Sequence, residues 1–153
     1  MLNNKGFTLI EVLISIFLLS VGLLAVAAMQ TTAMTGSSSS NNTTLSTQLA
    51  EEMVDRIRVN GGSTPNIYGT LDTVNCTGLG LVEPALTDCT QWRDRLQSSG
   101  LPGVTGDVAV VTDSPIPKAA TGGWGTTTVT VTVSWGIAGT RSTIVRTIIE
   151  THG

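Results

Sequence analysis

The sequence is poor in aromatic, charged and histidine residues, and these shortages argue against an enzyme. Aromatic residues make up 4% and charged residues 12% of the chain, and His152 is the only histidine. Because His152 lies near the C-terminal end, neither a Ser-His-Asp triad nor a histidine metal site is expected. The glycine patterns that bind nucleotide phosphates are absent as well. We therefore predict a structural subunit, not an enzyme, with no cofactor and no metal.

Basic residues are also scarce, and they form no cluster. The net charge is −3. Beyond residue 60 the only basic residues are Arg93, Arg95, Lys118, Arg141 and Arg146. A surface that binds nucleic acid normally carries a basic patch. We therefore expect no nucleic-acid partner, and a binding module that takes up DNA is a distant alternative.

Cysteine occurs at two positions only, Cys76 and Cys89. A structural zinc site normally needs four ligands, so this pair does not predict a metal site. In an exported domain the two residues are expected to form a disulfide, which would contribute about 3 kcal/mol by closing a loop of roughly 14 residues. Two reduced cysteines are the alternative if the domain stays in the cytoplasm.

What the sequence has in excess is a long apolar segment close to its start. From Phe7 to Met29, Glu11 is the only charged residue. As a helix this segment would be roughly 35 Å long, enough to cross a hydrocarbon core of about 30 Å. A carboxylate in such a segment costs on the order of 2.5–3.5 kcal/mol near the bilayer centre, so Glu11 is expected to need a partner.

The distribution of positive charge predicts the orientation of this segment. No lysine or arginine occurs between Lys5 and Arg56, so the positive charge near the segment lies on its N-terminal side. The cytoplasmic flanks of membrane spans carry the excess of lysine and arginine. We therefore expect a single span whose C-terminal side lies outside the cytoplasm.

Two simple interpretations of the segment are a secretory signal peptide, cleaved near residues 25–27, and a plain membrane anchor. Neither explains a glycine directly before Phe7 or an acid at the fifth position of the apolar run. The pattern Gly6-Phe7-Thr8-Leu9-Ile10-Glu11 closely resembles the class III signal of type IV prepilins and pseudopilins. The resemblance implies that residues 1–6 are a leader, that a prepilin peptidase cleaves between Gly6 and Phe7, and that Phe7 is then N-methylated.

The same resemblance implies a role for Glu11. In the assembled filaments of the family this acid is thought to pair with the terminal amine of a neighbouring subunit, which here would be that of Phe7. Either charge left alone in an apolar environment would cost several kcal/mol. The pair would therefore set the register of the subunit in the filament.

The helical pattern continues beyond the apolar segment, with one weak point. Residues 7–34 are expected to form a membrane and assembly helix, and residues 35–62 the second half of the same long helix. Residues 35–42 are rich in serine and asparagine, so they are either helical or locally melted. An apolar stripe that repeats every four residues predicts that residues 43–60 pack on a sheet. Its members are Leu45, Leu49, Met53 and Ile57.

Two stretches narrow the resemblance to the minor pilins of the PilV, or type IV pilus modification, family. The first comprises residues 15–24 and 27–30, and the second comprises residues 52–60. In the second stretch, an Asp-Arg-hydrophobic-Arg-x-Asn element closes the long helix of the family. Asp55 and Arg56 of this element lie either on a solvated face or in an interface with another minor pilin.

Residues 63–153 are expected to form a globular head with a small antiparallel sheet, so that the fold is α+β and pilin-like. We expect a loop over residues 63–87 and a short helix over residues 88–99, capped by Asp88 and with Trp92 in the core. Strands are predicted at residues 107–112, 126–135 and 141–151, with residues 114–125 as a mobile loop. The middle strand is the clearest, because valine and threonine alternate along it.

Fold and resemblance together predict a minor pilin that helps to initiate assembly of a type IV pilus at or near its tip, for adhesion and twitching motility. A minor pseudopilin of a type II secretion system is the alternative, because both classes share the signal. The expected partners are other minor and major pilins, the prepilin peptidase, the inner-membrane pilus assembly machinery and a tip adhesin. The chain is expected in the inner membrane, with its C-terminus in the periplasm, before assembly and in surface pili afterwards.

Overall fold

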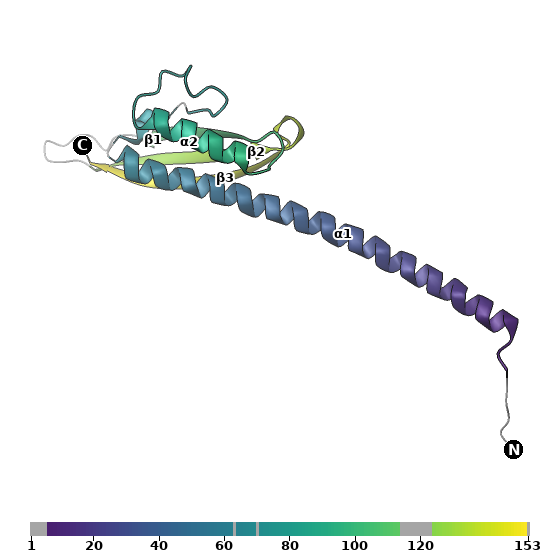
Figure 1. The fold of residues 1–153 in the computed structure, drawn as a ribbon. Coiled ribbons are helices and arrows are strands. Elements are labelled where there is room, and N and C mark those ends of the chain that lie inside the picture. Colours follow the sequence, from purple (N-terminus) through teal and green to yellow (C-terminus); the bar gives the residue numbers. More distant parts are fainter. Residues whose placement is uncertain (1–5, 63, 70, 114–123, 153) are drawn as a thin grey trace. The chain divides into compact units, whose positions relative to one another are not determined.

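The computed structural model of the protein describes residues 6–62, 64–69, 71–113 and 124–152. The chain forms two compact units, Met1–Asn41 and Asn42–Gly153. Its elements in chain order are α1 (Leu9–Arg56), a π-helical turn (Ile57–Gly61), a 3₁₀ turn (Pro65–Tyr68), α2 (Ala85–Ser98), β1 (Thr105–Asp113), β2 (Trp124–Trp135), a second 3₁₀ turn (Ile137–Gly139) and β3 (Arg141–His152) (Figure 1). A long N-terminal helix with a small antiparallel sheet is the predicted α+β, pilin-like fold.

In the first unit, α1 carries apolar side chains that the protein does not bury. Every described residue from 6 to 38 is exposed. By length and composition α1 is able to cross a membrane. The core helix of a soluble protein would bury such side chains, whereas a helix that exposes them needs an apolar environment.

The serine- and asparagine-rich stretch of residues 35–42 is helical, and α1 runs through it without a break. Hydroxyl groups at and just before its start donate to carbonyl oxygens one turn earlier, from Thr32 to Ala28 O (3.1 Å) and from Thr35 to Thr31 O (2.7 Å). These bonds occupy hydroxyls that would otherwise compete for the helical backbone groups. Of the two conformations that the sequence allows here, the structure has the helical one.

In the second unit, the C-terminal part of α1 lies on the sheet through the predicted apolar stripe. Three of the four stripe residues are buried and the fourth, Leu45, is partly buried. Ser46 Oγ lies 2.7 Å from Thr143 Oγ1 of β3. The helix ends in the π-helical turn, after which Gly62 has a φ of 48°, a conformation that favours glycine. The helical segment therefore ends at Gly61, one residue before the predicted end at residue 62.

Three antiparallel strands form one sheet in the order β1-β2-β3. All three predicted strands are confirmed, and each is longer than predicted. The valines of β2 and Trp135 are buried in the core, while its threonines at even positions alternate with them on the opposite face. Residues 114–123 of the predicted mobile loop lie outside the described residues.

The segment before α2 covers the outer edge of β1. Val108 N donates to Leu71 O (2.9 Å), and Thr73 N donates to Gly106 O (3.0 Å). Thr73 Oγ1 also accepts a hydrogen bond from Gly106 N (2.8 Å). This edge of the sheet is therefore paired, although the covering segment is no regular strand.

The second helix begins earlier than predicted, and Asp88 is not its cap. α2 starts at Ala85, directly after Pro84, and Asp88 lies in its first turn with its N–H bonded to Pro84 O (3.0 Å). A proline suits the start of a helix, because no backbone donor is needed there. The side chain of Asp88 is buried and accepts bonds from other elements, so it is not available as a cap.

Two contacts tie α2 to the rest of the head. Trp92 is fully buried, as predicted, and its indole N–H donates to Leu49 O of α1 (2.9 Å). The predicted disulfide between Cys76 and Cys89 joins the preceding loop to the start of α2. α2 is therefore held to the long helix by packing and to the loop by a covalent bond.

Gly106 generates a stability prediction, because β1 passes directly beneath α2 at this residue. A Cβ at Gly106 would overlap the ring of Trp92 and lie 2.9 Å from Leu96 Cδ1. We expect Gly106→Ala to lower the free energy of unfolding by about 1–3 kcal/mol, the usual cost of overpacking a core. Chemical denaturation in detergent micelles measures it. Ala109→Ser, on the exposed face of the same strand, should change stability by less than about 0.5 kcal/mol. Equal stability of both variants would contradict the packing described.

Candidate functional site

The residues of the predicted processing signal lie together at the start of the described chain. Gly6, Phe7 and Thr8 are exposed and precede α1. A side chain at Gly6 would meet nothing within 4 Å. The peptide bond between Gly6 and Phe7 is therefore in a non-helical, accessible segment, which is the form that a peptidase requires.

Glu11 lies in the first turn of α1, surrounded by apolar residues. Its N–H donates to Thr8 O (3.1 Å), and the residue is exposed. The partial positive charge of a helix N-terminus stabilises an acid by typically 0.3–1 kcal/mol, or about 2 kcal/mol in favourable cases. This is less than the cost of a carboxylate deep in a membrane, so the helix end alone does not compensate Glu11. The sequence offers no basic side chain between Lys5 and Arg56 to complete the compensation.

The other polar groups of the apolar segment satisfy themselves on the helix backbone. Ser15 Oγ donates to Glu11 O (2.7 Å), and Ser20 Oγ donates to Ile16 O (2.6 Å). Such bonds allow serine in a membrane helix, because no hydroxyl is left without an acceptor. Glu11 therefore differs from these serines in kind, since a carboxylate has no proton to donate to a carbonyl oxygen.

In the head, the buried carboxylate of Asp88 joins three elements. It accepts hydrogen bonds from Tyr68 Oη (2.6 Å) and Asn60 Nδ2 (2.8 Å), and Arg56 Nη1 lies 3.3 Å away. Burial and then the hydrogen bond to Asp88 raise the pKa of Tyr68 above its usual range, so the phenol remains a proton donor. The cluster fixes the end of the long helix against α2 and the 3₁₀ turn. Only the burial of Trp92 in this region was predicted from the sequence.

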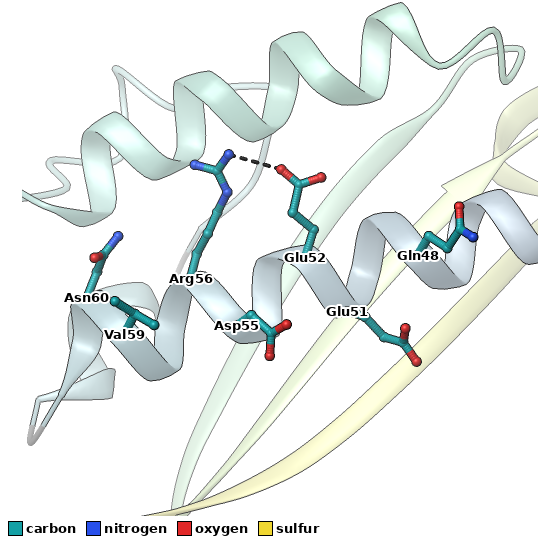
Figure 2. Close-up of a pocket in the computed structure, with 7 residues that line it drawn as sticks. All are labelled: Gln48, Glu51, Glu52, Asp55, Arg56, Val59 and Asn60. Carbon is teal, nitrogen blue, oxygen red and sulfur yellow. Dashed lines mark hydrogen bonds and ion pairs between the residues drawn. The ribbon is translucent and has the colours of Figure 1, made fainter.

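On the polar face of α1 next to this cluster, some side chains contact α2 and others are exposed. Glu52 and Arg56 point toward α2 and form an ion pair (3.0 Å), while Glu51 and Asp55 point away from it (Figure 2). Glu52 also lies 3.5 Å from Arg95 of α2. Of the two residues for which the sequence allowed either a solvated face or an interface, Arg56 is used within the head and Asp55 is exposed.

Two aspartates face each other where the covering segment meets β1. Asp72 and Asp107 form an isolated antiparallel bridge. Partial burial and then the negative charge of Asp72 raise the pKa of Asp107 above its usual value. Within the described residues, no group of three or more histidine, cysteine, aspartate or glutamate side chains is placed to hold a metal ion.

Residues 1–27 match the family described as the prokaryotic N-terminal methylation motif. The matched stretch contains the predicted leader, the predicted cleavage position, Glu11 and most of the apolar segment, and the head lies outside it. The chain thus carries the prepilin-type signal of type IV pilins and pseudopilins, which implies processing by a prepilin peptidase and assembly with pilus machinery. No curated protein and no solved structure matches the chain.

The Asp88 cluster predicts a large loss of stability on truncation. Asp88→Ala removes the acceptor of three donors, of which Tyr68 is buried, Arg56 is half-buried and Asn60 is exposed. It should lower the free energy of unfolding by about 2–4 kcal/mol. Tyr68→Phe leaves the other two donors in place and should cost about 1–2 kcal/mol. Asp94→Ala, on the exposed side of α2, is the matched control. Chemical denaturation that finds Asp88→Ala as mild as Asp94→Ala would show that the cluster does not stabilise the head.

The raised pKa of Asp107 predicts a pH-dependent effect. The folded state favours its protonated form, so Asp107 contributes stability below its ordinary pKa of 3.8 that is lost as pH rises through the higher folded value. Asp107→Asn should therefore raise the melting temperature slightly at pH 7, and the difference should vanish at pH 3. Glu150→Gln, an exposed acid of β3, serves as the control. A stabilisation that grows on acidification would have the wrong sign.

Proposed function

We propose that the protein is a minor pilin, a structural subunit that helps to initiate assembly of a type IV pilus at or near its tip. The observation that carries the proposal is a prepilin-type signal on a helix that exposes its apolar side chains and ends on a small disulfide-bonded head. The resemblance of residues 15–30 and 52–60 to the PilV-type minor pilins supports the finer assignment. Its partners in this role are the other pilins, the assembly machinery of the inner membrane and a tip adhesin.

Maturation begins with removal of residues 1–6. The peptidase cuts the accessible bond between Gly6 and Phe7 on the cytoplasmic side and methylates the new terminus. The cut frees an α-amino group four residues before Glu11 in the sequence. An amine of this kind is a cation at neutral pH, since its ordinary pKa is about 7.7–8.0. Processing therefore creates the positive charge that the apolar segment lacks.

The carboxylate of Glu11 then directs entry into the filament. A subunit that is in register places Glu11 against the terminal amine of a neighbour. A subunit that is out of register leaves both charges unpaired. Breaking a buried pair by removing one partner typically costs about 3–5 kcal/mol, far more than a surface pair. The charge pair therefore destabilises a misplaced subunit in the filament more than it stabilises a correctly placed one.

The head is expected to lie in the periplasm before assembly and on the pilus afterwards. Oxidised Cys76 and Cys89 are consistent with export, because disulfides persist in oxidising compartments. In this role the head contacts neighbouring pilin heads, while the apolar part of α1 packs among other pilin helices. Adhesion and twitching motility would then depend on the pili that it helps to initiate.

A minor pseudopilin of a type II secretion system is the alternative function, because the matched signal is shared by both classes. Deletion separates the two. Loss of surface pili and twitching with normal secretion supports the pilin, and loss of protein secretion with normal piliation supports the pseudopilin.

Processing is tested at the N-terminus. Intact-mass analysis of the membrane-extracted chain should find a mature protein that begins with N-methylated Phe7. Gly6→Val should retain residues 1–6, because the peptidase cuts after glycine. Gly22→Ala, at another exposed glycine of the same segment, should mature normally. A mature terminus at Ala28 would establish the ordinary signal peptide instead.

The role of Glu11 is tested by removing its charge. Glu11→Val should leave cleavage and membrane insertion intact and should lower the amount of the chain in sheared pili by at least about tenfold, the equivalent of roughly 1.4 kcal/mol. The number of pili should fall more than their length, because an initiating subunit acts in few copies. Ser15→Val, one turn further along α1, is the matched control. Wild-type levels of Glu11→Val in pili, with normal piliation, would exclude the pairing role.

A further inference from the structure

β3 is the outer strand of the sheet on the side opposite β1. It pairs with β2 over its whole length, from Trp124 opposite His152 to Trp135 opposite Arg141, in an unbroken one-to-one register. Among the described residues no other strand pairs with its second edge. A row of backbone N–H and C=O groups along this edge is therefore available to another chain.

The two edges of the sheet differ in whether another segment covers them. The edge of β1 is covered by Leu71 and Thr73, which hydrogen-bond to its backbone. β3 contains no proline, no lysine and no bulge, which are three of the devices that prevent strand addition, although it carries the charged residues Arg141, Arg146 and Glu150. It is rich in β-branched residues, which favour strand pairing. An edge of this kind is a site for strand addition unless a partner occupies it.

The exposed face of β3 presents an apolar pair around a positive charge. Ile144 and Ile148 are 60% and 66% exposed, and Arg146 lies between them on the same face. On the other side, a groove separates β3 from the end of the long helix. It is lined by Glu51, Asp55 and Arg58 of the helical segment and by residues 145–147 of β3. The edge thus has isoleucines around a cation on one side. In the groove on the other side, Asp55 is paired with Arg58 (3.3 Å), and Glu51 is the second acid.

We propose that the edge of β3 accepts an extended segment of another envelope protein as a fourth strand of the sheet. Main-chain hydrogen bonds to β3 would supply affinity, and alternate side chains would supply specificity. The segment has apolar residues against Ile144 and Ile148 with an acid opposite Arg146, and its other face carries a basic residue toward Glu51. The proposal rests on the chain being exported and anchored as proposed above.

A second copy of the chain is disfavoured by the direction of the helix. Ser46 contacts Thr143 and Arg58 Nη2 donates to Thr147 Oγ1 (2.6 Å), so the helical segment and β3 run in the same direction, side by side (Figure 1). Two β3 strands paired antiparallel about a two-fold axis would make the two helical segments antiparallel. If that pair is centred on the exposed isoleucines, it also places Arg146 of one copy opposite Arg146 of the other, and like charges directly opposite each other are unfavourable. A different protein has no such restriction.

Site-specific photo-crosslinking of the full chain in its native envelope tests the proposal. A benzophenone amino acid replaces Ile148 in one strain and Val111 in the control, since Val111 is also exposed on the same face but lies on the covered strand. We expect crosslinks from position 148, at least about tenfold above position 111, to one contiguous segment of another envelope protein. Arg146→Glu should lower the yield about tenfold, and changing the opposing acid of the partner to arginine should restore it.

Several outcomes would overturn the proposal. Crosslinks from position 148 only to a second copy of this chain, or only to residues 114–123 of the same chain, would assign the edge to another occupant. Equal yields from positions 148 and 111 would show an unspecific surface. The N-terminus is measured in the same samples: absent crosslinks with a mature Phe7 terminus refute the edge proposal alone, whereas a retained leader refutes the proposed function.

Discussion

The central constraint on this chain is one carboxylate, Glu11, in an otherwise uncharged apolar segment. The segment is long enough to span a membrane, and the sequence places no lysine or arginine between Lys5 and Arg56. The serines of this segment donate to the helix backbone, but a carboxylate has no proton to donate. Within the described part of the chain, no basic side chain of α1 lies near enough in the sequence to pair with it. In the proposed function the compensating cation is the amine created by cleavage before Phe7, so maturation and assembly are coupled by one charge.

The long helix serves two environments in turn. Its first part leaves every described side chain from residue 6 to residue 38 exposed, as a lipid or a bundle of similar helices would require. Its last part buries an apolar stripe on the sheet and directs Arg56 toward Asp88. The head is then closed by the disulfide between Cys76 and Cys89 and by the packing of Trp92 over Gly106. Within this unit, these contacts hold the last part of α1 to the head.

The head gives the two edges of its sheet different roles. Leu71 and Thr73 pair with β1, so that edge is satisfied within the chain. β3 runs beside the helix with a regular backbone edge and two exposed isoleucines. In the proposed function, an initiating subunit binds partners that differ from those of a repeating subunit. The proposed addition of a strand to β3 would meet that requirement.

The sequence predicted the features that arise from local patterns. The alternation along β2 predicted a half-buried strand, the four-residue repeat ending at Ile57 predicted the packed part of α1, and Gly6 with Glu11 predicted the signal that the comparison confirms. The start of α2 was predicted wrongly. Aspartate is a common helix cap, but Asp88 accepts hydrogen bonds from donors that are distant in the sequence. The Asp88 cluster and the cover over β1 were missed for the same reason. Each depends on contacts between segments whose spacing carries no periodic signal.

Mass spectrometry of filaments sheared from the cell surface tests the central claim most directly. A minor pilin should appear in them as a chain that begins with N-methylated Phe7, in far fewer copies than the major subunit. It should disappear from the sheared fraction in cells that cannot assemble pili. Detection of the chain only in the inner membrane while pili are abundant, or detection in pili with residues 1–6 still attached, would contradict the proposed assembly through a processed terminus.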